Sequence, residues 1–238
     1  MICIKIIEWN IKHGGSTERI PNILGSILKF DADIVVITEF RSPRQDELVA
    51  GLTTGGYTNF ISSNPDTNKN GIFVASKVEL RQIPTSYIHD GARQRWLEIE
   101  ISDMNCRLLC LHVPGAGDSW GKEPFWKAIL EYAKNNLEER VVMVGDFNTG
   151  LEIDAQGTPF VLSEYMESLL EMGWTDVWRA INPGVREYSW YSNAGNGFRL
   201  DYLYASPSIS KSVQDIRFSH AEREKGFSDH SILIATVG

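Results

Sequence analysis

A carboxylate and a carboxamide stand two positions apart in the segment Gly145-Asp146-Phe147-Asn148. The four apolar residues before it, 141–144, do not alternate with polar ones, which is typical of a short strand buried on both faces. Because side chains at i and i+2 of an extended chain point the same way, we expect Asp146 and Asn148 to emerge together from the strand's carboxyl end. This pair suits gripping a metal ion or a water molecule. An ordinary turn is the alternative, since Gly, Asp and Asn are the usual turn residues.

Polar residues also occupy the ends of other apolar segments. Asn10, Glu39 and His112 stand at such ends, Asp201 lies inside an otherwise apolar strand, and Asp229 and His230 come just before the final strand. A buried or half-buried carboxylate is costly unless it is paired or bound to a metal ion. With Asp146 and Asn148, this makes four acidic residues, two amides and two histidines, which favours one shared site over a set of unrelated loops.

Hydrophobic periodicity predicts the elements that must position these residues. Strands are expected at 2–9, 33–39, 57–61, 71–76, 80–84, 96–102, 107–113, 141–144, 200–205, 213–219 and 232–237. Helices are expected at 17–30, 43–52, 123–138 and 162–172. The first helix shows apolar residues at i, i+3, i+4, i+7 and i+8, with Ser16 or Thr17 as its expected N-cap and Pro21 in its first turn.

The order of these elements predicts an α/β fold with a large antiparallel component. A strand, a helix and a second strand in the first 39 residues indicate a crossover unit, whereas residues 96–101 alternate as in a half-buried antiparallel strand. No repeat, low-complexity segment or linker marks a domain boundary. We therefore expect residues 1–238 to form one domain, with two sheets packed together and helices outside them.

Composition narrows the classes of function. The chain has 238 residues, of which 42% are hydrophobic and 23% charged, as is ordinary for a soluble globular protein. Its net charge is −8, which argues against broad nonspecific binding to a polyanion, because such binding needs a basic surface. A locally basic cleft remains compatible with that charge.

Cysteine usage and hydropathy indicate a cytoplasmic protein. Three cysteines do not make a disulfide framework, and Cys106 and Cys110 would lie roughly 13 Å apart in one strand, too far to bridge. A reducing compartment fits best. The first eight residues are too short and too charged for a signal peptide, and no apolar run approaches the roughly 20 residues of a membrane span.

The ordered motifs of this chain resemble those of a known family. Trp-Asn-Ile, Ile-Thr-Glu, His-Val-Pro-Gly-Ala-Gly, Gly-Asp-Phe-Asn, Arg-Leu-Asp-Tyr-Leu and Ser-Asp-His occur in the order seen in the endonuclease/exonuclease/phosphatase superfamily. The resemblance covers roughly residues 4–234, and Gly-Asp-Phe-Asn with the downstream Ser-Asp-His is its specific part. It implies a deoxyribonuclease I-like four-layer α/β sandwich, in which two packed mixed sheets are flanked by helices.

The resemblance also implies metal-assisted hydrolysis of a phosphate ester, usually with Mg²⁺ or Mn²⁺. Hard oxygen ligands suit these ions, and no Cys/His cluster in the sequence suggests zinc. By resemblance, Glu39 is the main metal ligand with Asn10 beside it. Asp229 would serve a second metal ion or the outer shell of the same one.

Roles for the remaining polar residues follow from the same resemblance. Asp146 would activate or orient the attacking water, and Asn148 would hold that water or a phosphate oxygen. His230 would contact the scissile phosphate as a cation, while Asp201 accepts from its other ring nitrogen and raises its pKa. His112 takes a position where family members carry a Tyr or His that touches the phosphate.

Two positions depart from the apurinic endonucleases of this family. Lys12 replaces an acidic residue that helps to bind metal, and Asp118 stands where those enzymes often place an arginine that grips DNA. Trp120, Trp190 and Phe198 are expected to line a pocket for a base, sugar or lipid group, although core packing is the likelier role for at least one of them. The basic residues first expected to contact phosphate are Arg93, Arg95 and Lys122.

A divalent-metal phosphodiesterase acting on nucleic acid is the favoured function, because the Val-Pro-Gly-Ala-Gly and Arg-Leu-Asp-Tyr motifs are of the apurinic-endonuclease type. The acidic net charge instead favours a phosphatase or phosphodiesterase that acts on a small or lipid phosphate ester. A binding protein that kept the fold and lost turnover is the third reading. It is disfavoured because Lys12 is the single departure among the core acidic and histidine positions.

Overall fold

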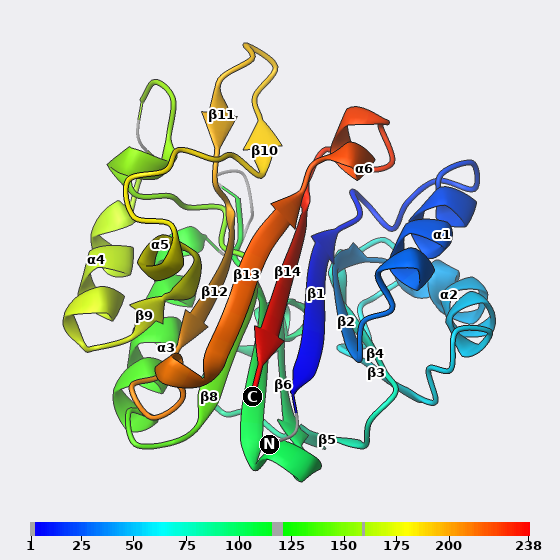
Figure 1. The fold of residues 1–238 in the computed structure, drawn as a ribbon, viewed down its shortest axis with the longest axis horizontal. Coiled ribbons are helices and arrows are strands. Elements are labelled where there is room, and N and C mark those ends of the chain that lie inside the picture. Colours follow the sequence, from blue (N-terminus) through cyan, green and yellow to red (C-terminus); the bar gives the residue numbers. More distant parts are fainter. Residues whose placement is uncertain (1–2, 116–120, 159) are drawn as a thin grey trace.

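Two six-stranded mixed sheets form the centre of the protein (Figure 1). The computed structural model describes residues 3–115, 121–158 and 160–238. The first sheet has the order β13 (Val213–Ser219), β14 (Ile232–Val237), β1 (Ile4–Asn10), β2 (Ile34–Phe40), β4 (Gly71–Ser76) and β3 (Asn59–Ser62). The second has the order β5 (Leu80–Ile83), β6 (Trp96–Ile101), β7 (Cys106–His112), β8 (Val141–Asp146), β12 (Asp201–Ala205) and β9 (Thr175–Asp176).

Helices cover the outer face of each sheet. Helices α1 (Ile20–Phe30) and α2 (Gln45–Thr53) pack against the first sheet, and α3 (Lys122–Asn135) and α4 (Ser163–Glu171) pack against the second. The short helix α5 (Val177–Ile181) contacts β12 and β9 of the second sheet and the edge strand β13 of the first, so it bridges the two sheets on that side. The layers are therefore helix, sheet, sheet and helix, which confirms the predicted fold class.

Strand alternation assigns each residue to a face. In β1, Ile4 and Ile6 pack in the core between the two sheets, whereas Ile7 and Trp9 pack with residues of α1 and α2. The period of two along the strand places Glu8 and Asn10 on the inner face with Ile4 and Ile6. The inner layer is therefore apolar at one end of β1 and polar at the other.

Two helical crossovers create the parallel strand pairs of the sandwich. Helix α1 connects β1 to the parallel strand β2, and α3 connects β7 to the parallel strand β8. The other neighbouring strands pair antiparallel. Because the carboxyl ends of parallel strands meet at one edge, each sheet presents two such ends side by side.

Several boundaries differ from the sequence prediction. Helix α1 begins at Ile20 after Arg19, without a side-chain cap, so the prediction of Ser16 or Thr17 as N-cap was wrong. The carbonyl of Ser16 instead accepts from the backbone nitrogens of Arg19 and Ile20, in a turn that precedes the helix. Pro21 does lie in the first turn, as predicted. Helix α3 ends at Asn135 rather than near 138.

The region around residues 173–199 contains elements that periodicity does not reveal. Besides β9 and α5, this region forms the hairpin of β10 (Trp190–Tyr191) and β11 (Gly197–Phe198). A further short helix, α6 (Ala221–Glu224), follows β13. These strands have only two residues each, too few for a pattern with period two. None of the helices in the described ranges is long and apolar enough to cross a membrane.

Candidate active site at the ends of the central strands

The sheet register brings the predicted polar residues to one end of the sandwich. His112 and Asp146 are partners at the carboxyl ends of the parallel strands β7 and β8. Asp201 opens the antiparallel strand β12 directly opposite Asp146. In the first sheet, Asn10 ends β1 opposite Thr38, one residue before Glu39. Two sheets packed face to face therefore enclose these side chains between their ends.

Two of these residues, Glu39 and Asn148, have unusual backbone conformations. Glu39 has φ 53° and lies where the register of β2 with β4 shifts between Thr38 and Phe40. Asn148 has φ 46° in the loop after β8. Positive φ is unfavourable for residues other than glycine, and it persists where surrounding contacts enforce it. In these conformations the Glu39 carboxylate accepts from Asn10 and His13, and the Asn148 amide donates to the carbonyl of Val113.

Asn10 links the acidic residues of the two sheets. Its Nδ2 donates to Oδ2 of Asp146 at 2.9 Å and to Oε1 of Glu39 at 3.3 Å. Its Oδ1 accepts from the backbone nitrogen of Lys12 at 2.9 Å, which fixes the orientation of the amide. The other oxygen of Glu39, Oε2, accepts from the backbone nitrogen of His13 at 2.7 Å. Two carboxylates and one amide thus converge from different strands, and the amide faces both carboxylates with its nitrogen.

Asp146 is a buried carboxylate with a raised pKa. Burial is the largest cause; the cation His230 lowers the pKa, Asp201 raises it, and the pKa of Asp146 lies at about 7. Its Oδ1 accepts from the backbone nitrogen of Asn148 at 2.8 Å. The side chain of Asn148 donates to the carbonyl of Val113 at 2.9 Å, which ties the two loops together. A carboxylate with this pKa can accept a proton near neutral pH.

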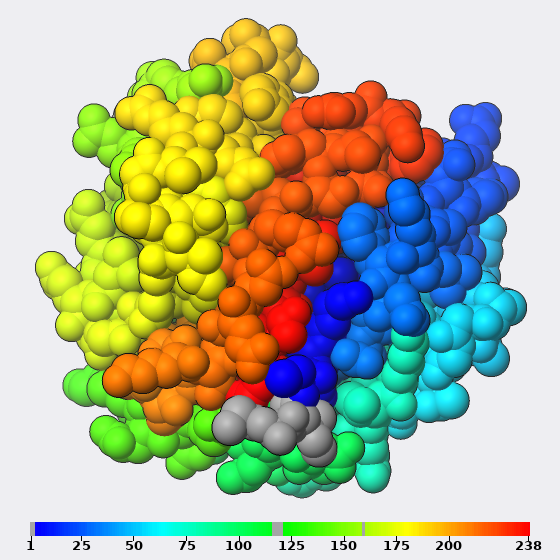
Figure 2. Space-filling model, in the orientation of Figure 1, coloured from blue at the N-terminus to red at the C-terminus, as the bar shows by residue number. Residues whose placement is uncertain are grey.

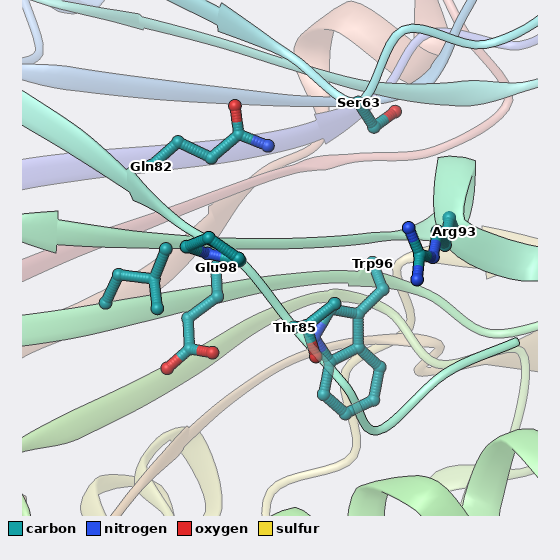
Figure 3. Close-up of a pocket in the computed structure, with 8 residues that line it drawn as sticks. Ser63, Gln82, Thr85, Arg93, Trp96 and Glu98 are labelled. Atoms are coloured by element: carbon teal, nitrogen blue, oxygen red, sulfur yellow. The ribbon is translucent and has the colours of Figure 1, made fainter. Parts of the chain in front are cut away.

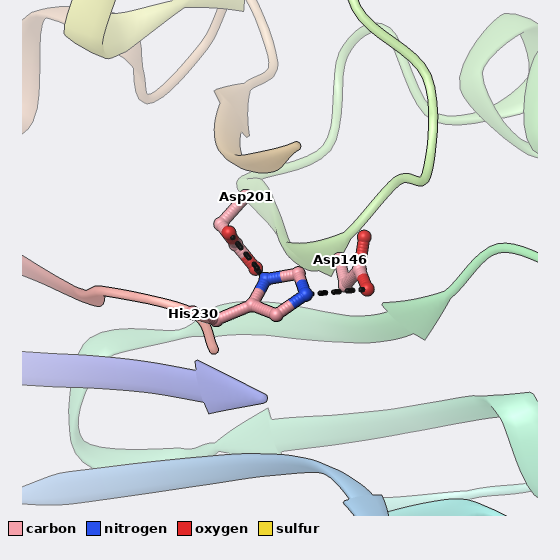
Figure 4. Close-up of side chains that lie close together, drawn as sticks. All are labelled: Asp146, Asp201 and His230. Carbon is pink, nitrogen blue, oxygen red and sulfur yellow. Dashed lines mark hydrogen bonds and ion pairs between the residues drawn. The ribbon is translucent and has the colours of Figure 1, made fainter. Parts of the chain in front are cut away.

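His230 lies between two carboxylates (Figure 4). Its Nδ1 is 2.9 Å from Oδ2 of Asp201, and its Nε2 is 3.9 Å from Oδ2 of Asp146. Burial alone would lower the pKa of His230, but the charges of Asp201 and Asp146 raise it to about 10. The imidazole is therefore a cation at neutral pH, as predicted for a group that faces negative charge.

His112, unlike His230, is neutral. Burial lowers its pKa well below the usual value, and the nearby cations Arg95 and His230 lower it further. Nη1 of Arg95 is 2.9 Å from Nδ1 of His112, and Nε2 of His112 is 3.8 Å from Oε1 of Glu39. The site thus holds one neutral imidazole and one imidazolium.

Glu8 is a buried acidic residue of the site that sequence reasoning missed. Its Oε1 accepts from Oγ1 of Thr38 at 2.9 Å. The pKa of Glu8 lies well above its usual range, and burial is the largest cause. The charge of Asp201 raises it further, the hydrogen bond from Thr38 lowers it, and the charge of Asp146 raises it. Glu8 therefore holds its proton more tightly than an ordinary glutamic acid does. The sequence did contain a signal for Glu8. The period of two along this apolar strand places the Glu8 carboxylate on the same face as Ile4 and Ile6.

His13 is a second residue that sequence reasoning missed. It lies in the loop after β1, and its Nδ1 is 2.9 Å from Oε2 of Glu39. The main chain around the site is held by buried donors: Nε1 of Trp9 donates to the carbonyl of His230 at 3.0 Å, and Nε1 of Trp126 donates to Oγ1 of Thr149 at 3.0 Å. These contacts position the loops without contributing charge.

A wholly buried ion network supports the start of β12. The guanidinium of Arg199 pairs with Asp154 at 2.7 Å and with Asp176 at 2.6 Å, and it stacks 4.1 Å from the ring centroid of Tyr202. Arg199 has no exposed surface. It is two residues from Asp201, so the network fixes the strand that carries the partner of His230.

The other predicted contact residues are distributed around this centre. Trp190 lies beside His230, with ring centroids 6.5 Å apart, and Phe198 packs on Trp190 at 5.9 Å. Nζ of Lys122 donates to the carbonyl of Asn148. Asp229 pairs with Lys12 at 3.1 Å. Lys122, Trp190 and Phe198 therefore lie next to the site. Asp229 is next to it as the residue that directly precedes His230.

Arg93 is the predicted substrate contact that the structure does not bring to the cluster. It pairs with Asp90 at 2.8 Å and lines a separate hollow of about 390 Å³ with Ser63, Gln82 and Trp96 (Figure 3). Arg95, two residues on, reaches His112 instead. Asp118 and Trp120 lie outside the described residues.

Carboxylate oxygens suited to a hard divalent cation gather in the site, since Nδ2 of Asn10 brings Glu39 and Asp146 together. A group of three potential ligands whose atoms lie within 4.8 Å of one another is formed by Asp146, Asp201 and His230. In that group, Nδ1 of His230 is already occupied by Asp201 and the ring is protonated, so it cannot donate an electron pair to a metal ion. The carboxylate oxygens of Glu39 and Asp146 fit the ion better. Oδ1 of Asn10 would become a further ligand if the amide turned away from the backbone nitrogen of Lys12.

Fold and site together define a class of hydrolases that cleave phosphate esters within a two-sheet sandwich. The model of the endonuclease/exonuclease/phosphatase family matches residues 7–230, and the chain therefore belongs to this family. This confirms the predicted family and the predicted class of enzyme.

Relatives and solved structures agree with this assignment. The chain is 25% identical to an exodeoxyribonuclease of Bacillus subtilis (strain 168), over 91% of this chain and 93% of that protein. Its fold is similar to that of NExo, a 3′-phosphatase from Neisseria bound to a product DNA hairpin, with TM-score 0.83, 21% identity and 99% of each chain covered. An AP endonuclease from Archaeoglobus fulgidus matches with TM-score 0.82, 21% identity and 98% of each chain covered.

Proposed function

We propose that this protein is a divalent-metal-dependent nuclease that hydrolyses phosphodiester bonds of DNA. One observation carries the proposal: the His230 imidazolium, held by Asp201 at 2.9 Å, lies 3.9 Å from the Asp146 carboxylate, which Nδ2 of Asn10 joins to the Glu39 carboxylate. A cation, a proton acceptor and metal-binding oxygens at one point are what phosphate-ester hydrolysis needs. The exodeoxyribonuclease and the DNA-bound 3′-phosphatase among the similar proteins favour DNA over other esters.

Mg²⁺ or Mn²⁺ is the proposed cofactor, with Glu39 and Asn10 as its protein ligands. When bound, such an ion supplies Lewis-acid polarisation of a phosphate oxygen. Asp229 is proposed to act only in the outer shell, because Lys12 already places a positive charge 3.1 Å from its Oδ2. Glu8 is not proposed as a ligand, because it is buried and its raised pKa favours the protonated form.

Four side chains are proposed to act on the phosphate and the water. Asp146 accepts a proton from the attacking water, and the amide of Asn148 orients that water or a phosphate oxygen. His230 stabilises the negative charge that develops on the phosphate, and Asp201 holds its ring in position through Nδ1. His112 is neutral, so it contacts the phosphate as a hydrogen-bonding group, next to the charge of Arg95.

We further propose that residues 1–238 act as one catalytic domain, because each sheet supplies part of the site. A cytoplasmic location is proposed as well. It is supported by Cys3, Cys106 and Cys110, which are free thiols and form no disulfide in the described part of the chain.

The test compares substrates under controlled metal conditions. Purified protein is assayed with Mg²⁺, Mn²⁺ or EDTA on single- and double-stranded DNA, abasic DNA, DNA with a 3′-phosphate, RNA, bis(p-nitrophenyl) phosphate, and inositol and sphingolipid phosphates. We expect metal-dependent cleavage of DNA that EDTA abolishes. Turnover confined to the small or lipid esters would overturn the nuclease proposal in favour of a phosphatase or phosphodiesterase, and no metal-dependent turnover on any substrate would overturn both.

A further inference from the structure

We propose that a hollow beside the site binds a second phosphodiester group of the nucleic-acid strand, next to the one that is cleaved. The hollow has a volume of about 490 Å³ and is lined mainly by Lys12, Arg19, Tyr191, Arg223, Ser228 and Asp229. This inference rests on the proposed function, because the neighbouring phosphate belongs to the same strand. In the space-filling view, the segment with α6 lies beside the segment with β10 and β11 at the same end of the molecule (Figure 2).

The charge of this hollow is opposite to that of the whole chain. Lys12, Arg19 and Arg223 contribute three cations and Asp229 one carboxylate, within a protein whose net charge is −8. Asp229 is paired with Lys12 at 3.1 Å. In the described residues, Arg19 and Arg223 have no carboxylate partner. A hollow with an excess of fixed positive charge attracts an anion.

The cationic groups are held rigidly before any ligand arrives. Arg19 donates to the carbonyls of Ile11 at 3.1 Å, Phe227 at 3.0 Å and Lys12 at 2.8 Å. These bonds join the loop after β1 to the loop before β14, and they satisfy the donors of Arg19 without neutralising its charge. A pre-organised charge loses little side-chain entropy when it binds an anion.

Arg223 is the residue that can grip the phosphate directly. Its Nε donates to Oγ of Ser231 at 3.0 Å, and its guanidinium lies 4.5 Å from the ring centroid of Tyr191. These two contacts engage Nε and one face of the guanidinium, and no bond from its terminal nitrogens is formed within the described ranges. Two parallel N–H groups match the oxygens of a phosphate. Tyr191, with 40% of its surface exposed, holds the guanidinium in place.

The hollow shares its wall with the catalytic cluster. Ser228 and Asp229 directly precede His230, and Oγ of Ser228 donates to the carbonyl of Asn10 at 2.5 Å. On the other side, the backbone of Lys12 donates to Oδ1 of Asn10 at 2.9 Å. A strand whose scissile phosphate contacts His230 therefore continues naturally into the hollow. A mononucleotide-sized ester would not reach it.

The variants Arg223→Gln and Tyr191→Ala test this inference, with Arg81→Gln as the control because Arg81 lies on β5, outside the hollow. Steady-state cleavage is measured on bis(p-nitrophenyl) phosphate, a dinucleotide and a 12-mer oligonucleotide. Binding of a fluorescent 12-mer is followed by anisotropy in EDTA from low to high salt. The binding arm needs no turnover, so it stays decisive even if the proposed nuclease activity fails. Inorganic phosphate is added as a competitor in a separate series.

We expect Arg223→Gln to raise KM for the 12-mer about tenfold, the size of a lost bond to a charged group. Turnover of bis(p-nitrophenyl) phosphate and of the dinucleotide should not change. The slope of log affinity against log salt should fall by about 0.7, which corresponds to one phosphate contact on a single strand. Tyr191→Ala should act in the same direction, and inorganic phosphate should compete only weakly. Equal losses on all three substrates, or an unchanged salt slope with an unchanged KM, would overturn the inference.

Discussion

At the scale of single residues, the site separates two histidines by charge. His230 is cationic because Asp201 and Asp146 outweigh its burial, whereas His112 is neutral because burial and the cation Arg95 act in the same direction. Both rings have little exposed surface. Their different charge states therefore arise from their neighbours, and Asp146, raised to a pKa of about 7, is the proposed proton acceptor between them.

Removing the proton acceptor or the cation should abolish most of the turnover. Asp146→Asn or His230→Ala is expected to lower kcat by at least about 100-fold, the usual size of a general-base or charge-stabilising contribution. Steady-state cleavage of the best DNA substrate measures this effect. Asp103→Asn is the matched control, since Asp103 is exposed in the turn between β6 and β7, at the opposite end of the strands. Near-normal kcat in either site variant would show that the assigned roles are wrong.

The Asp201 carboxylate should determine the charge of His230. Asp201→Asn is expected to bring the pKa of His230 down from about 10, because burial then acts with less opposition. Titration of the His230 ring protons by NMR in EDTA measures this change. In the wild type the folded-state pKa lies above the ordinary value of 6.5, so the pair stabilises the fold fully below pH 6.5 and progressively less as the pH rises to about 10. The stability difference between wild type and variant should shrink over that range; an unchanged His230 titration would contradict the assignment.

At the scale of elements, the close pairing of β7 and β8 requires a glycine just before the catalytic carboxylate. Gly145 has φ 150°, and a Cβ at this position would lie 1.8 Å from the carbonyl oxygen of Leu111. That atom belongs to the backbone of the neighbouring strand, so it cannot turn aside as a flexible side chain could. The glycine therefore lets Asp146 and His112 end their strands in register.

Gly145→Ala should destabilise the protein by at least about 2 kcal/mol, because overpacking against backbone forces the strands apart. Urea unfolding followed by circular dichroism measures the free energy of unfolding. Gly25→Ala is the matched control: no atom lies within 4 Å of its added Cβ in α1, so the exchange should stabilise by about 0.5 to 1 kcal/mol. Equal stabilities for both variants would contradict this account of β7 and β8.

At the scale of the whole molecule, the site is assembled across the interface between the sheets. Asn10 and Glu39 come from the first sheet, and Asp146 and Asp201 from the second. Carboxylates brought together in this way repel each other unless a cation lies between them. The sandwich therefore gains stability from any cation that bridges its two halves at this end.

Mg²⁺ should raise the melting temperature of the wild-type protein. A ligand present at 100 times its Kd stabilises the folded state by about 2.7 kcal/mol. Differential scanning calorimetry with MgCl₂, against NaCl of equal ionic strength, measures the shift. In Glu39→Gln the proposed ligand loses its charge, so the shift should be much smaller. An identical Mg²⁺ effect in both proteins would show that the ion binds elsewhere.

Most of the fold and much of the site were predictable from local patterns. Alternating and continuous apolar runs predicted the long strands, and the polar residues that end them, such as Asn10 and His112, pointed to one end of the sheets. Patterns with period two or 3.6 need several residues, so the two-residue strands β9, β10 and β11 escaped detection. Helix α1 started later than predicted, because Ser16 uses its backbone carbonyl in a preceding turn rather than its side chain as a cap.

The sequence by itself determined which side chains are present at the strand ends, and hence the family and the kind of chemistry. Only the tertiary structure decided their charge states and partners. It placed Arg93 in a separate hollow and Arg95 beside His112. It also brought Glu8 near the charges of Asp201 and Asp146, which raise its pKa, and gathered Lys12, Arg19 and Arg223 around another hollow. The physical reason is that strand identity depends on residues close in the chain, whereas burial and pairing depend on groups that meet only when the two sheets pack.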